Sequence, residues 1–403
     1  MHSGSTCQEA GVRAGRAGVG CRGRPGRAWG CDTGIVLPSD RSPAAGAASE
    51  FVRVLKGNLA ALALAAAGAA LFAGATLAQG AAPPDPAPVA KTAPVQQLSF
   101  YPDALTKPIE SKVTAGGPEV LDRALKTNLE YGLNIRPVNA PAEHPLLPKV
   151  REILRSLPPA VHKLASQYVV AIYLLQEDWG TGTTEGVQDA DGAWKYSYIT
   201  LNLTALTRPA NAWATWKENS AFRPEPGHRL AMTIQPPEGD TLENAIQFIL
   251  IHELGHAIGL GLAVHGFWDE EGMPPATRDS AFVALSWQPD GKGWLASRYT
   301  EKFPKLVLAR FYRFDQAPLV LSDAEGIYRA LSQTNLPSLY AVTNIYDDFA
   351  ETFAVYVHTK LLGKPYKVEV FANGTPRYTY TSCISADTCL DKVRTLETLL
   401  KLK

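Results

Sequence analysis

The chain contains the sequence FILIHELGHAIGLG at Phe248–Gly261. Apolar side chains fill almost every position around two histidines, which indicates a helix that is buried on all sides. Thr241 is a suitable N-cap, so the helix is predicted to run over Leu242–Leu260. On such a helix His252 and His256 lie four residues apart, and both imidazoles therefore point from the same face.

Two imidazoles on one helix face are a metal-binding pattern. Each offers a neutral nitrogen that can bind Zn²⁺ at about 2.0–2.1 Å. Glu253 stands next to the first histidine. There it can act as general base toward a zinc-activated water and pass the proton to a leaving amine. The alternative is a buried helix whose histidines have ordinary polar partners.

Zinc needs a third protein ligand and an open position for water. A third histidine is one route, but the HExxHxxGxxH pattern has Leu262 at that position, and His265 comes three residues too late. A carboxylate from a second helix is the other route. The segment Asn344–Leu361 predicts this helix, and its Asp347 and Glu351 share a face because they are four residues apart. A solvated acidic face is the alternative explanation of these carboxylates.

Together the two segments resemble those of gluzincin metallopeptidases. They are most similar to the lethal-factor-like branch and to bacterial zinc-binding metallopeptidases with an E-D-[FW]-A-E-T-[FW]-A segment, which DDFAETFA at 347–354 matches. The resemblance implies a zincin-like domain with an active-site helix and a second ligand-bearing helix. It implies Asp347 as third zinc ligand, Glu351 as the carboxylate that supports the site, and Tyr340 as the donor that stabilises the transition state.

The third-ligand position departs from the family, because it holds an aspartate where the family has a glutamate. Either Asp347 binds with the two helices closer together, or Glu351 has taken over as the ligand. The resemblance covers only these two segments and says little about the other parts of the chain.

Changes of composition define the expected organisation of the chain. Residues 1–51 are rich in Gly, Arg, Ala and Ser, and we expect a disordered or mis-called extension. Residues 52–80 contain basic residues, the apolar run Leu59–Ala78 and small residues, which is the pattern of a signal peptide. Residues 81–117 are typical of a Pro/Ala-rich linker, and residues 118–403 are predicted to be the catalytic domain.

The signal peptide predicts a periplasmic or secreted protein without membrane association, unless Leu59–Ala78 stays uncleaved as an anchor. Cys383 and Cys389 are close together, and the predicted mature chain has no other cysteine. A disulfide is therefore expected in an oxidising compartment, with two unrelated thiols as the alternative. Lysine plus arginine equals aspartate plus glutamate, 39 each, which gives no reason to expect a nucleic-acid partner.

Helical and strand patterns occur in separate groups, which favours the α+β class. Besides the two helices above, helices are expected over 120–133 and 147–165, strands over 168–175, 194–203 and 229–234, and a hairpin over 368–380. The predicted function is an exported zinc metalloendopeptidase, a hydrolase with a protein or peptide substrate. The alternative is a non-catalytic zinc-binding or interaction module, which loss of Glu253 would usually mark; Glu253 is present.

Overall fold

The computed structural model describes residues 92–130, 132–268, 277, 279–291 and 294–401. The predicted extension, signal peptide and first part of the linker, residues 1–91, lie outside the described residues, and so does Leu59–Ala78. Within the described ranges, no helix combines the length and the apolarity that crossing a bilayer requires.

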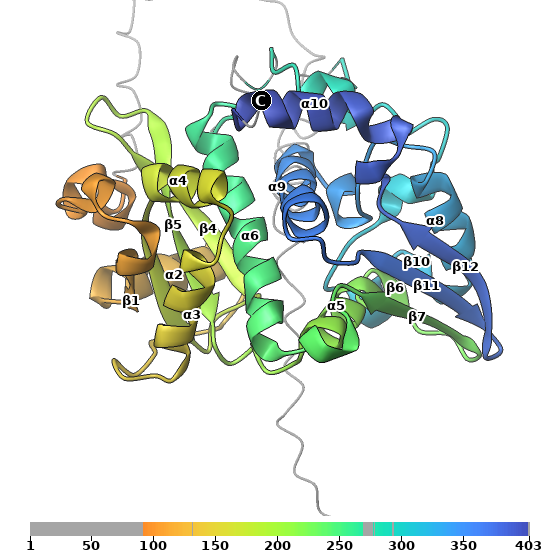
Figure 1. The fold of residues 1–403 in the computed structure, drawn as a ribbon, viewed down its shortest axis with the longest axis horizontal. Coiled ribbons are helices and arrows are strands. Elements are labelled where there is room, and N and C mark those ends of the chain that lie inside the picture. The colour runs from red at the N-terminus through yellow and green to blue at the C-terminus, as the bar shows by residue number, and fades with distance from the viewer. Residues whose placement is uncertain (1–91, 131, 269–276, 278, 292–293, 402–403) are drawn as a thin grey trace, which may run out of the picture. The chain divides into compact units, whose positions relative to one another are not determined.

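Helices and strands both contribute to the fold, as expected for a mixed class (Figure 1). The helices are α2 Pro118–Glu130, α3 Leu146–Arg155, α4 Pro159–Tyr168, α5 Ala210–Asn219, α6 Leu242–Gly261, α8 Ala324–Leu331, α9 Ile345–Tyr356 and α10 Leu390–Leu399. The strands of the largest sheet are β1 Val113–Ala115, β2 Val138–Asn139, β3 Val169–Gln176, β4 Gly182–Gln188 and β5 Trp194–Asn202.

Further strands form three small sheets. They are β6 Phe222–Arg223 with β10 Leu319–Val320, β8 Trp287–Pro289 with β9 Leu295–Ser297, and β7 His228–Thr233 with β11 Lys367–Ala372 and β12 Thr375–Thr381. The hairpin β11–β12 turns at Asn373 and Gly374, whose φ angles of 51° and 75° suit these two residue types. The predicted hairpin is thus confirmed.

The largest sheet has the order β1-β3-β5-β4, with β2 also paired to β3. Strands β1 and β5 run parallel to β3, whereas β4 runs antiparallel to β5 and forms one edge. Both faces of β3 are buried: Val169, Ile172 and Leu174 belong to the main core, and Val170 and Tyr173 to a second core. The continuous apolar run of β3 follows from this burial on both sides.

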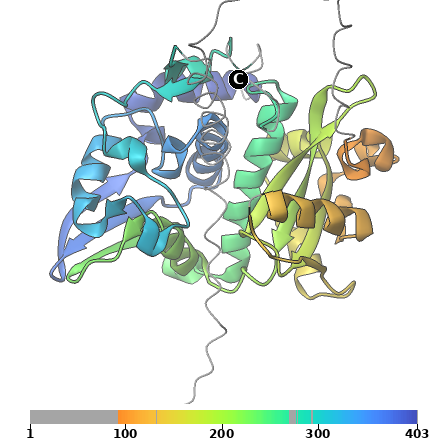
Figure 2. The ribbon, with the colours of Figure 1, turned by 180° about the vertical axis from the view of Figure 1, so that it is seen from behind.

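Helix α6 lies between this sheet and helix α9, as both views of the ribbon show (Figures 1 and 2). The side chain of Thr241 caps its N-terminus by accepting from the backbone N–H of Asn244 at 3.2 Å. The predicted bounds of this helix are confirmed to within a residue. Because α6 has partners on several sides, its apolar side chains are buried almost all round, as the sequence predicted.

Two expectations about the N-terminal half are wrong. The linker predicted over 81–117 is instead packed structure from residue 94 on, where Val95 and Ile109 are fully buried and β1 pairs with β3. Proline and alanine suggested an extended chain, but the apolar residues between them reach the core. The helix predicted over 147–165 is two helices, because Pro158 and Pro159 end α3 and begin α4.

Candidate metal centre

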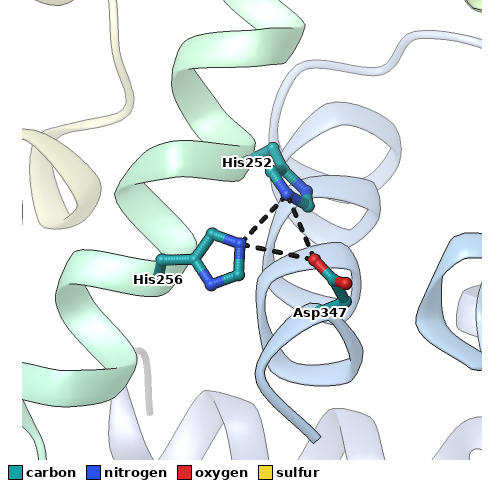
Figure 3. Close-up of side chains that lie close together, drawn as sticks. All are labelled: His252, His256 and Asp347. Atoms are coloured by element: carbon teal, nitrogen blue, oxygen red, sulfur yellow. Dashed lines mark hydrogen bonds and ion pairs between the residues drawn. The ribbon is translucent and has the colours of Figure 1, made fainter. Parts of the chain in front are cut away.

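Helix α6 presents His252 and His256 to helix α9, which presents Asp347 back to them (Figure 3). The Nε2 atoms of the two histidines are 3.2 Å apart. Oδ1 of Asp347 lies 3.8 Å from Nε2 of His252 and 3.5 Å from Nε2 of His256. The structure thus brings together three of the residues that the sequence singled out.

These three distances fit a single metal ion. Atoms bound at about 2.0–2.1 Å to one tetrahedral ion lie roughly 3.3–3.4 Å from one another. The three candidate ligand atoms are mutually 3.2, 3.5 and 3.8 Å apart. The side chains of His256 and Asp347 remain 15% and 12% exposed, so water can reach the group. This buried set of His252, His256 and Asp347 could therefore hold a metal ion with a position left for water.

Asp347 keeps one oxygen for a metal and uses the other for local hydrogen bonds. Its Oδ2 accepts from the hydroxyl of Thr343 and from Nδ2 of Asn344, each at 2.7 Å. Asn344 also caps helix α9, because its side chain accepts from the backbone N–H of Asp347. Burial alone would raise the pKa of the Asp347 carboxyl. The hydrogen bond and charge of His256 outweigh that effect and hold the pKa below its usual value.

Glu351 lies one turn further along α9 and meets a different nitrogen of His252. Its Oε1 is 3.0 Å from Nδ1 of His252 and 3.0 Å from Nζ of Lys217. Burial would raise the pKa of the Glu351 carboxyl, but the Lys217 charge and the His252 hydrogen bond lower it well below the usual value. An ionised Glu351 with Oε1 beside Nδ1 favours the proton of His252 on that nitrogen, which leaves Nε2 to face Asp347.

Glu253 is held by the edge strand β4. The hydroxyl of Thr184 donates to Oε2 of Glu253 at 2.7 Å, and Gly182 lies against the same carboxyl group. A Cβ on Gly182 would be 3.0 Å from Cγ and 3.1 Å from Oε1 of Glu253. The absent side chain at Gly182 therefore leaves room for the carboxyl group of Glu253.

The two helices that carry the candidate ligands approach closely where α6 has a glycine. A Cβ on Gly255 would lie 2.7 Å from Cα and 3.0 Å from the carbonyl oxygen of Ala350. Only glycine allows this approach. Since Gly255 lies between the two histidines in sequence and Ala350 follows Asp347 by less than one turn, the contact brings the shorter aspartate side chain within reach of both imidazoles.

Two tyrosines lie near the candidate ligands His252, His256 and Asp347, which together are called the metal group below. The ring of Tyr340 lies 5.6 Å from that of His252, and the ring of Tyr312 lies 6.4 Å from that of Tyr340. Burial raises the pKa of both hydroxyls well above 10, and the charges of Asp347 and Glu253 raise it further. Both tyrosines therefore stay protonated and can donate hydrogen bonds. Tyr312 adopts a φ of 58°, which is uncommon for a bulky residue.

The other residues noted in the sequence lie elsewhere. Asp348 points away from the metal group to the buried ammonium of Lys392, at 2.7 and 2.9 Å. His265 is buried, its Nδ1–H donates to the Gly266 carbonyl, and burial lowers its pKa to about 4. Among the described residues, the group that could hold a metal does not include His265.

Cys383 and Cys389 are joined as a disulfide beside the start of α10.

Sequence reasoning missed Lys217, Thr184 and Tyr312. They come from helix α5, strand β4 and a loop, and no spacing relates them to the histidines. Comparisons of the chain with protein-family models, with curated proteins and with solved structures found no match. What the site can do therefore has to be inferred from its own side chains.

Proposed function

We propose that this chain is a zinc-dependent metalloendopeptidase of the gluzincin kind, with a zincin-like fold. The observation that carries the proposal is the juxtaposition of His252, His256 and Asp347 at mutual distances that suit a tetrahedral ion. Two imidazoles, one carboxylate and a position open to water are the donor set of a catalytic zinc site. Asp347 is the proposed third ligand, and Glu351 orients His252 from behind.

The same donor set, two histidines and one carboxylate, also occurs in non-haem iron oxygenases. Glu253 favours the hydrolytic function, because it follows His252 directly and its carboxyl is positioned by Thr184. Glu253 also argues against the second candidate, a non-catalytic zinc-binding module. Such a module does not require a buried carboxylate, held by Thr184, directly after a candidate metal ligand.

A zinc ion held by His252, His256 and Asp347 would supply the Lewis acid that activates a water and polarises a peptide carbonyl. Glu253 takes the proton of the attacking water and later delivers it to the leaving amine. Tyr340 donates its hydroxyl hydrogen to the oxygen of the carbonyl as negative charge develops there. Glu351 keeps His252 in one tautomer and orientation throughout.

Export is a further part of the proposal and rests on the pattern of residues 52–80. The proposed location is the periplasm or the medium, and the proposed substrate is a protein or peptide. Sequencing the N-terminus of the mature protein distinguishes a cleaved, exported form from a form tethered by Leu59–Ala78.

The test of the peptidase activity is digestion of a mixture of random-sequence peptides, with and without a chelator. We expect cleavage that the chelator stops and that added zinc restores. Glu253→Gln should keep the metal and lose most of the activity, because the ligands remain and the base is gone. Unchanged turnover in Glu253→Gln at full zinc content would rule out the mechanism.

A further inference from the structure

Lys217 is a buried cation that contacts two residues next to the candidate metal site, Glu351 and Tyr340. It lies on helix α5, and only 7% of the residue is exposed. Its Nζ is 3.0 Å from Oε1 of Glu351, the same oxygen that lies 3.0 Å from Nδ1 of His252. Burying an ammonium group is costly unless it is paired, so this position needs a reason.

The same ammonium group also lies over an aromatic ring. Nζ of Lys217 is 4.0 Å from the ring centre of Tyr340, and 5.8 Å from those of Trp213 and Phe311. A cation at 4.0 Å is well inside the range of a cation–π interaction, and desolvation strengthens the attraction. Lys217 therefore contacts, at once, the carboxylate behind His252 and the face of the proposed oxyanion donor.

Each contact has a chemical consequence. The positive charge of Lys217 holds Glu351 ionised with Oε1 beside Nδ1 of His252, which directs Nε2 of the imidazole toward the position where a metal would bind. On the ring of Tyr340, the positive charge draws electron density away from the phenol oxygen. The hydroxyl then becomes a stronger donor, although burial and the nearby carboxylates act in the opposite direction.

We infer that Lys217 is a positioning residue for the proposed peptidase reaction, acting on the metal through Glu351 and His252 and on the developing oxyanion through Tyr340. The inference rests on the proposed function, and it assigns to α5 a part of the site that the two ligand-bearing helices do not contain. A purely structural lysine would serve only to neutralise Glu351. The two roles differ in how zinc affinity and kcat respond when the charge at position 217 is removed, as in Lys217→Met, or kept, as in Lys217→Arg.

The first experiment measures zinc affinity by competition with a chromophoric chelator, for wild type and for Lys217→Met, Lys217→Arg and Lys112→Met. Lys112 is the matched control, since it is also buried, but its Nζ donates to the carbonyls of Ser166 and Val169, away from the site. We expect Lys217→Met to bind zinc about 10- to 100-fold more weakly, as when a partner of a metal ligand is lost. Lys217→Arg, which keeps the charge, and Lys112→Met should bind close to wild type.

The second experiment measures kcat and KM at saturating zinc, with a peptide that the wild type cleaves. Losing an oxyanion donor outright typically costs about 10²–10³-fold in kcat; Lys217→Met only weakens one, so we expect a loss on the order of tenfold with little change in KM. In the Tyr340→Phe background the same substitution should cost much less, because the hydroxyl on which it acts is gone.

Three outcomes would overturn the inference. Wild-type zinc affinity and kcat in Lys217→Met would show that the lysine has no role at the site. Lys217→Met performing better than Lys217→Arg in both assays would show that packing matters and charge does not. Full additivity of the kcat losses in Lys217→Met and Tyr340→Phe would show that Lys217 does not act through Tyr340.

If Lys217→Met does not fold, Lys217→Gln replaces it, since glutamine is neutral and can still pair with Glu351. A wild type that binds zinc but cleaves no peptide would contradict the proposed function. The zinc affinities of the Lys217 variants would then still decide whether Lys217 acts on the metal site through Glu351 and His252.

Discussion

At the scale of single residues, the site depends on side chains whose two polar atoms do different things. Asp347 directs Oδ2 to Thr343 and Asn344 and leaves Oδ1 facing the histidines. His252 directs Nδ1 to Glu351 and Nε2 into the same space. Asp347 and His252 are thus each held through their second polar atom, so little rotamer freedom of these two side chains has to be lost when an ion binds.

Thr184 fixes Glu253 in the same manner, so the Thr184 hydroxyl should contribute to turnover. Thr184→Val removes the 2.7 Å hydrogen bond to Oε2 but keeps the size of the side chain. We expect zinc content to stay at the wild-type level and kcat to fall on the order of tenfold, the worth of a hydrogen bond to a charged group.

Thr183→Val is the matched control for that prediction. Thr183 is the neighbouring residue of strand β4, so its side chain points to the opposite face of the sheet. It should leave kcat nearly unchanged. Equal kcat values for Thr184→Val and wild type would show that Glu253 does not need this hydrogen bond.

The residues that could be predicted from the sequence are those whose relation is local. His252 and His256 are four residues apart, and so are Asp347 and Glu351, so helix periodicity alone places each pair on a shared face; Glu253 follows His252 directly in the sequence. Lys217 and Thr184 reach the same site from α5 and β4, and no periodicity connects them to it. Their roles depend on tertiary contacts, which the order of residues along one element does not express.

At the scale of elements, the spacing of α6 and α9 decides whether an aspartate can serve as ligand. The two helices approach closely at Gly255 and Ala350, which leaves no room for a side chain on the glycine. The sequence left two explanations of Asp347 open, closer helices or a change of ligand to Glu351. The contact at Gly255 favours the first, because it shortens the span that the missing methylene would otherwise bridge.

Gly255→Ala should separate these helices. The new methyl group would meet the backbone of Ala350 at 2.7–3.0 Å, and backbone cannot rotate away. We expect a loss of about 1–3 kcal/mol in the free energy of unfolding, as in other overpacked cores. Zinc affinity should fall as well, since Asp347 is then drawn away from the histidines. Thermal unfolding and chelator competition measure the two effects.

Gly326→Ala is the control, because Gly326 is also within a helix, α8, and a Cβ there meets nothing within 4 Å. It should be neutral or stabilise the protein slightly, by roughly 0.5–1 kcal/mol, since alanine favours the helix. Undiminished zinc affinity in Gly255→Ala would mean that the close approach is not what brings Asp347 to the metal.

The elements that the sequence misplaced are those in which proline or glycine is mixed with core residues. Residues 94–112 contain prolines, yet Val95 and Ile109 are fully buried, so the composition of a linker was misleading. Strand β4, which holds Glu253 in place, was not predicted at all, since GTTEGVQ lacks the apolar alternation of an ordinary strand. Both cases show tertiary burial overriding a local signal.

At the scale of the whole molecule, a second helix contact holds α9 in place. Asp348 accepts from Nζ of Lys392 on α10 and from Nε1 of Trp287 on β8 at 2.9 Å. All of these groups are buried, so the C-terminal helix is tied to the ligand-bearing helix by an ion pair away from solvent. Asp347 therefore faces the two histidines, whereas Asp348 binds the same helix to α10 and β8.

Acid should weaken the whole fold through His358. Burial lowers the pKa of this histidine to about 4, and its Nε2–H donates to the Ile234 carbonyl at 2.7 Å. The unfolded chain takes up this proton near pH 6.5 and the folded chain only near pH 4. The stabilisation that comes from neutral His358 is therefore complete above about pH 6.5. It is lost as the pH falls to 4, which lowers the free energy of unfolding by roughly 3 kcal/mol.

The measurement is the free energy of unfolding in urea at several pH values between 7 and 4. His358→Gln should flatten the slope across this window, because glutamine does not titrate. His144→Gln, which alters a half-exposed histidine, is the control. Equal slopes for His358→Gln and wild type would show that the proton on His358 does not control acid stability.

We propose that side chains from two helices, α6 and α9, form one zinc site. The most direct measurement is the zinc content of purified protein after dialysis against buffered zinc, for wild type, Asp347→Ala and Glu351→Ala. The claim predicts about one zinc per chain in wild type, almost none in Asp347→Ala, and an intermediate content in Glu351→Ala. Zinc-free Glu351→Ala with fully loaded Asp347→Ala would reverse the two roles. Full loading of both variants, or no zinc in the wild type, would contradict the site itself.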